Sequence, residues 1–132
     1  MRLVEHIVRA DEMAIEATAV VRDSWPTARD GAVRTIMLIE LVAQTSAALQ
    51  GWKERQEHTG KGGLLVGVQS AVPAATTIPV GTHVRCTVRI SYGASNYLAF
   101  EGEVTASDGT RWMTASIQAY RPDEANPTGP RP

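Results

Sequence analysis

The sequence is short of the residue types that mark several common protein classes. It has one cysteine, Cys86, so no disulfide can form within the chain and a cytoplasmic setting is expected. Its 13 Lys and Arg nearly balance its 14 Asp and Glu, and this near-neutrality argues against a nucleic-acid-binding surface. No apolar run is long enough to span a membrane, and the first residues lack the apolar segment of a signal peptide. What remains is the profile of a globular protein, 43% hydrophobic and 20% charged.

The 132-residue length suits one domain, which we expect to cover residues 1–122. The stretch from Pro122 to Pro132 holds four prolines, one glycine and one asparagine. Few of these residues could offset the entropy of ordering. Residues 123–132 are therefore predicted to form a flexible C-terminal tail.

The strongest pattern predicts a helix over Thr35–Gln56. This range contains no proline and one glycine, Gly51, and it is too long for a strand. Its first half is apolar nearly all round, which predicts a buried helix rather than a surface one. The charged stretch Trp52–Glu57 should emerge into water, and the glycines of Thr59–Gly63 should end the helix.

The other segments predict an antiparallel sheet. A hairpin is expected before the helix, over Arg2–Val8 and Ala14–Arg22, followed by a loop over Asp23–Gly31. An extended connection, Pro73–Gly81, is expected after the first of four later strands, which are predicted over Leu64–Val72, Thr82–Tyr92, Tyr97–Ala106 and Arg111–Arg121. The predicted fold class is α+β, a curved antiparallel sheet wrapped around one long central helix.

Glu40 is the unusual residue of the predicted helix, because it stands between Ile39 and Leu41. A carboxyl group in such surroundings must be hydrogen-bonded or hold a proton near neutral pH, and the second property suits a general acid/base. Gln44 lies four residues on and shares the same helical face, where it could orient the carboxyl or contact a substrate carbonyl. A buried glutamate satisfied by backbone amides is the alternative interpretation.

Few other residues offer chemistry. Cys86 has the apolar parity of its strand, which favours a small buried side chain over a nucleophile. The three histidines and the single cysteine form no metal-binding set. His6, on the first predicted strand, is the histidine best placed to reach Glu40, although a satisfied strand histidine is the commoner role. Trp25, in the loop before the helix, could cover a tunnel mouth, although packing is its commoner role.

The stretch Leu38–Gln44, LIELVAQ, resembles the start of the central helix in the 3-hydroxyacyl-acyl-carrier-protein dehydratases. Gly63–Gly67, Pro79–Gly81 and Gln118–Pro122 are similar to the same superfamily, in its branch associated with aryl-polyene and related polyketide pathways. The resemblance covers residues 2–122 and implies the hot-dog fold, as a dimer with active sites at the interface. It also implies removal of water from a β-hydroxyacyl thioester.

The resemblance further implies the site. Glu40 matches the catalytic carboxylate, and a tunnel beside the helix takes the acyl chain of an acyl-carrier-protein or coenzyme A thioester, in fatty-acid or polyketide-type synthesis. No metal or redox cofactor is implied. The candidate catalytic residues are Glu40 and His6, and the candidate substrate-binding residues are Gln44, Trp25, Leu65 and Gly67.

The sequence departs from this family in the loop before the helix. Well-known members carry a histidine there, whereas Asp23–Gly31 contains none. Dehydration needs a second proton-transfer group besides Glu40. Three functions stay open: a dehydratase-like enzyme, a catalytically impaired protein that binds an acyl thioester or partners another hot-dog subunit, and an acyl thioesterase. A homodimer or a heterodimer is expected, with no nucleic acid or membrane partner.

Overall fold

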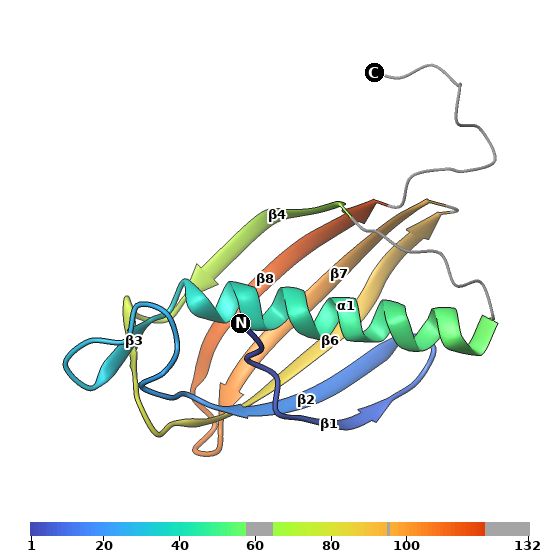
Figure 1. The fold of residues 1–132 in the computed structure, drawn as a ribbon. Coiled ribbons are helices and arrows are strands. Elements are labelled where there is room, and N and C mark those ends of the chain that lie inside the picture. The colour runs from blue at the N-terminus through green and yellow to red at the C-terminus, as the bar shows by residue number, and fades with distance from the viewer. Residues whose placement is uncertain (58–64, 95, 121–132) are drawn as a thin grey trace.

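A computed structural model describes residues 1–57, 65–94 and 96–120, with only the backbone described for residues 52–57, 65 and 66. In this part of the chain one long helix lies beside a set of β-strands (Figure 1). In chain order the elements are β1 (His6–Ala10), β2 (Ala14–Val20), β3 (Ala32–Arg34), α1 (Met37–Glu57), β4 (Leu65–Pro73), β5 (Thr77–Pro79), β6 (His83–Ala94), β7 (Tyr97–Ala106) and β8 (Arg111–Tyr120).

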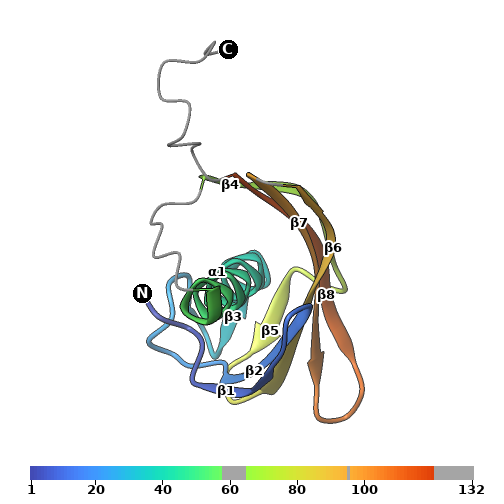
Figure 2. The ribbon, with the colours of Figure 1, turned by 90° about the vertical axis from the view of Figure 1, so that its right-hand side faces the viewer.

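The main sheet has six strands in the order β1-β2-β6-β7-β8-β4, and each neighbouring pair is antiparallel. Viewed along the helix, the sheet curves and holds α1 on its concave side (Figure 2). The predicted architecture, a curved antiparallel sheet with one long helix, is therefore confirmed. The strands β1 and β4 form the two edges of the described sheet.

Alternation along the strands explains which face is buried. In β6, Val84, Cys86 and Val88 are buried while the residues between them are exposed, as expected for a sheet with one covered face. The hydrophobic core lies between this concave face and α1. We call the other side of the sheet its convex face.

The helix contributes residues three and four positions apart to the core. Its buried side chains are Leu38, Leu41, Val42, Thr45, Ser46, Leu49 and Gln50. This spacing places them on one side of a helix, and α1 contacts β2, β6, β7 and β8. Both ends of the predicted helix lie within two residues of the observed ones. Within the described residues, no helix has the length and apolar character needed to cross a membrane.

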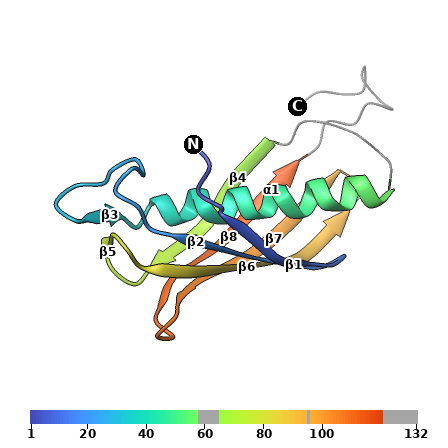
Figure 3. The same ribbon diagram turned by 60° about the horizontal axis from the view of Figure 1, so that its bottom comes forward.

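Two short strands were missed by the sequence pattern. The strand β3 lies between the predicted loop and the predicted helix, and β5 lies in the predicted extended connection. The two strands pair with each other near the N-terminal end of α1 (Figure 3). Each has three residues, too few to show alternation, but Val33 and Ile78 at their centres are fully buried. The predicted helix end at Thr59–Gly63 and the tail over residues 123–132 lie outside the described residues.

Close contact between α1 and the sheet depends on a glycine in β7. A Cβ atom built on Gly102 would lie 2.5 Å from Cγ1 of Val42. Val42 is fully buried and β-branched, so its side chain has little rotamer freedom with which to move away. The helix can approach β7 this closely because residue 102 has no side chain.

We expect Gly102→Ala to lower the free energy of unfolding by about 1–3 kcal/mol, because the added methyl overpacks the contact with Val42. Gly67→Ala is the matched control in β4, since a Cβ at Gly67 meets nothing within 4 Å. It should change stability by less than about 0.5 kcal/mol. Urea unfolding measures both variants, and equal effects would contradict the close packing of α1 on β7.

Candidate functional site

Glu40 lies in the first turn of α1, on the side that faces away from the sheet, and is exposed. The expectation that Glu40 is buried inside an enclosed helix is therefore wrong for this chain. The sheet covers one side of α1, and the uncovered side, which we call the open face, carries Glu40, Gln44 and Ala47. Ile36, just before the helix, is 58% exposed, so an apolar side chain also lies uncovered near this face.

The Gln44 side chain joins Glu40 to the start of the chain. Its Nε2 donates a hydrogen bond to Oε2 of Glu40 at 3.1 Å and a second one to the carbonyl of Met1. Its Oε1 accepts from the backbone N–H groups of Leu3 at 2.7 Å and of Val4 at 3.3 Å. The prediction that Gln44 shares a face with Glu40 and can orient its carboxyl is consistent with this geometry.

The N-terminal segment, Met1–Val4, was not recognised as part of the site from the sequence. It lies across α1 (Figure 3), and Leu3 and Val4 are buried against the core. The contact joins residues 41 positions apart, and no local pattern in one sequence reveals such a pairing. It also explains why β1 begins at His6 rather than at Arg2.

A hollow of about 520 Å³ opens beside this contact. It lies between the N-terminal segment and the middle turns of α1, where the small side chains of Ala47 and Ala48 leave room for it. Its lining residues are Met1, Arg2, Val4, Ile7, Gln44, Ala47 and Ala48. Most of these side chains are apolar, so an apolar group next to Glu40 would be accommodated here.

His6 lies on the convex face, away from Glu40. His6 lies opposite Thr18 on the neighbouring strand β2. Ala17 and Ala19, on each side of Thr18, are buried on the concave face, so the side chains of Thr18 and His6 point to the convex face. The expectation that β1 presents His6 to Glu40 is therefore wrong within one chain. The sequence parity was ambiguous because β1 carries a register irregularity between Ile7 and Arg9.

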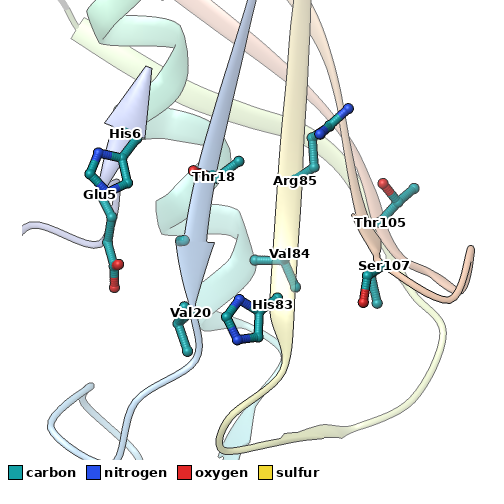
Figure 4. A pocket seen from close by; sticks show the side chains of 11 residues that line it. Glu5, His6, Thr18, Val20, His83, Val84, Arg85, Thr105 and Ser107 are labelled. Carbon is teal, nitrogen blue, oxygen red and sulfur yellow. The ribbon is translucent and has the colours of Figure 1, made fainter. Parts of the chain in front are cut away.

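A second hollow, of about 730 Å³, contains His6 (Figure 4). It lies on the convex face, and polar side chains of several strands reach it. Among its lining residues are Glu5, His6, Thr18, His83, Arg85, Thr105 and Ser107. The Arg85 and Glu5 side chains are already paired. Arg85 forms an ion pair with Glu16 at 2.8 Å. Arg22 donates a hydrogen bond to the Glu5 carboxylate and thereby lowers the pKa of that carboxyl group.

The remaining candidate residues lie apart from Glu40. Trp25 is 4% exposed and belongs to the core, so it packs rather than covering an opening. Leu65 and Gly67 lie in the edge strand β4, and Gly67 is exposed with open space at its Cβ position. The structure thus brings Glu40 and Gln44 together and leaves Trp25, Gly67 and His6 elsewhere.

Cys86 is a buried side chain, as the strand parity predicted. Burial raises the pKa of its thiol to about 12, and a hydrogen bond with Thr45 opposes that rise. A thiol that keeps its proton is a poor nucleophile. Among the described residues, the open face of α1 therefore supplies one carboxyl group and one amide for chemistry, and Gln44 is the hydrogen-bond partner of Glu40.

A curved antiparallel sheet holding one long helix is the hot-dog fold, and solved structures of that fold match the chain. One chain of the dehydratase heterocomplex ApeI:P from Xenorhabdus doucetiae superposes with a TM-score of 0.81 at 17% identity, and the match covers 94% of this chain and 85% of that chain. A hypothetical thioesterase with coenzyme A from Streptococcus pneumoniae gives 0.68 at 12% identity, covering 89% and 84%. The E. coli PaaI protein gives 0.67 at 12% identity, covering 89% and 79%.

The sequence comparison gives the family. A family model described as ApeP dehydratase matches residues 1–128, so the chain belongs to the ApeP-like family. No curated protein matches the sequence. The predicted membership in a dehydratase-like hot-dog superfamily is confirmed.

The raised pKa of Cys86 predicts a pH-dependent stability. Above its ordinary pKa of 9.0 an unfolded cysteine loses its proton, whereas the folded thiol keeps it to about pH 12. The folded state then binds more protons, so stability falls as pH rises through this window, by at most about 1.4 kcal/mol per pH unit. Cys86→Ala lacks this titration. Urea unfolding from about pH 8 to about pH 11 should show the wild type losing stability relative to Cys86→Ala. A constant difference would mean that the folded thiol ionises normally.

Proposed function

We propose that this protein is a subunit of a 3-hydroxyacyl-thioester dehydratase, with Glu40 as one of the two proton-transfer groups. The observation that carries the proposal is the exposed Glu40 carboxyl on the open face of α1, held by Gln44 beside an apolar hollow. Membership in the ApeP-like family supports the reaction class. The proposed substrate is a 3-hydroxyacyl chain carried by an acyl carrier protein or coenzyme A, in fatty-acid or polyketide-type synthesis.

Dehydration has two proton transfers. A base takes a proton from C2 as the C2–C3 double bond forms, and an acid protonates the hydroxyl that leaves C3 as water. Glu40 can serve only one of these roles at a time. His6 and His83 lie on the convex face, so neither reaches Glu40 within one chain.

The second group therefore comes, in this proposal, from another hot-dog subunit that covers the open face. Ala47 and Ala48 leave room for close approach of another chain, and the exposed Ile36 would be removed from water by it. The similar ApeI:P protein is a heterocomplex, which favours a heterodimer over a homodimer. A partner subunit whose own loop carries a histidine would complete the acid/base pair.

Two alternative functions, a non-catalytic binding or partner protein and an acyl thioesterase, would give different assay results. A protein that only binds an acyl thioester or supports a partner would contribute no catalytic group. A thioesterase would use Glu40 to activate water and would release a free thiol. Structural similarity to a hypothetical thioesterase shows the shared fold alone, so the reaction has to be decided by assay.

The test is hydration of crotonyl-coenzyme A by this chain, alone and combined with a hot-dog subunit of the same genome that has the loop histidine. We expect little activity from the chain alone and clear hydration by the pair. Glu40→Gln should lower the rate of the pair at least about 100-fold, because the amide cannot transfer a proton. Glu12→Gln, an exposed glutamate in the β1–β2 turn, is the control and should leave the rate unchanged.

Each other outcome contradicts the proposal in its own way. Full activity of the chain alone would show that no second subunit is needed. A pair in which Glu40→Gln keeps the wild-type rate would identify this chain as a non-catalytic partner. Release of free thiol, dependent on Glu40, would identify a thioesterase instead.

A further inference from the structure

The orientation of the Gln44 amide is fixed by the backbone of the N-terminal segment. Leu3 and Val4 present two N–H groups to one end of the amide, and an N–H can only donate, so that end must be the oxygen. The NH2 end then faces the carbonyl of Met1 and the carboxylate of Glu40. No rotation of the amide by half a turn satisfies the same partners.

These contacts use the full hydrogen-bonding capacity of Gln44. Its oxygen accepts two hydrogen bonds and its nitrogen donates two. Gln44 therefore has no donor left for a substrate carbonyl. One of its N–H groups donates to one lone pair of Glu40 Oε2, so Oε1, which does not bond Gln44, is the oxygen better placed for proton transfer.

The N-terminal segment is itself held in place. The side chains of Leu3 and Val4 are 1% and 7% exposed. Arg2 Nε donates to the carbonyl of Val4 at 3.1 Å, and the N–H of Glu5 donates to the carbonyl of Thr18 at 3.0 Å. A segment anchored by the buried Leu3 and Val4, and bonded at its far end to β2, is a rigid support, whereas an exposed glutamine without such partners would sample several rotamers.

We propose that Met1–Val4 is a positioning element of the site, which sets the orientation of the Glu40 carboxylate through the Gln44 amide. This inference rests on the proposed function, in which Glu40 transfers a proton. It makes Gln44 a positioning residue rather than one that binds substrate. Residues 36 or more positions away from Glu40 in the sequence would then control its catalytic rate.

A double-mutant cycle in the active two-subunit complex tests this arrangement. Gln44→Met removes the amide at similar size, and Leu3→Pro removes the shorter N–H donor while keeping an apolar side chain. Each variant should lower kcat about tenfold and leave KM for crotonyl-coenzyme A unchanged. The double variant should be no slower than Gln44→Met alone, because both changes break the same connection.

Controls separate positioning from stability. Ile117→Ala, in β8, loses core packing but keeps every hydrogen bond of the N-terminal segment, so it should lower the Tm and leave kcat near that of the wild type. Gln44→Glu keeps an oxygen for the two backbone donors but loses the NH2 group. It should reproduce the kcat loss even if Leu3→Pro does not fold.

Hydrogen exchange of the Gln44 side-chain amide tests the contact with the N-terminal segment without relying on enzyme activity. In the wild-type protein, NMR should show the Gln44 side-chain NH2 protons slowed in exchange with water, and Leu3→Pro should abolish that protection. Additive kcat losses, a raised KM in Gln44→Met, or a freely exchanging Gln44 amide would overturn the inference. If Glu40→Gln has no effect in the same complex, the proposed function fails, whereas the NMR result still reports on the contact.

Discussion

The arrangement of the whole site depends on the one-sided contact between α1 and the curved sheet. Leu38, Leu41 and Val42 bury one side of the helix, and Gly102 lets that side approach β7 closely. The same contact turns Glu40 and Ala47 away from the sheet. A carboxyl group is thus exposed on the open face because the apolar residues beside it are used to hold the helix.

Two faces of the molecule are separated by this geometry. The open face carries the Glu40–Gln44 pair and an apolar hollow. The convex face carries His6, His83 and most of the ion pairs found among the described residues. Because a sheet and its core lie between them, groups on the convex face cannot take part in chemistry at Glu40 in the same chain. The proposed second subunit follows from this separation together with the missing loop histidine.

The sequence alone predicted those elements that are determined by residues close together in the chain. The length and low glycine content of α1 predicted its ends to within two residues. The turn residues on each side of Tyr97–Ala106 predicted β7 with both of its boundaries. The pairing of Glu40 with Gln44 followed from their four-residue spacing. In contrast, β3 and β5 are too short for a pattern, and their formation depends on burial of Val33 and Ile78 by distant elements.

The exposure of Glu40 could not be predicted from the helix alone. An apolar stretch on every side of a helix indicates that it will be covered, but it does not say whether the covering surface belongs to the same chain. The face of the sheet on which His6 lies depends on the pairing of β1 with β2, which has a register irregularity. The contact of Leu3 with Gln44 joins residues 41 positions apart, so no local pattern predicts it.

Coverage of the open face of α1 by a second subunit can be measured by labelling a cysteine placed there. Ala47→Cys should react rapidly with a maleimide in the chain alone, against a low background because Cys86 is buried. Addition of the histidine-carrying subunit should slow labelling at position 47 at least about tenfold and leave Ser107→Cys, on the convex face, unaffected. Equal labelling of position 47 with and without the second subunit would show that this subunit does not cover the open face.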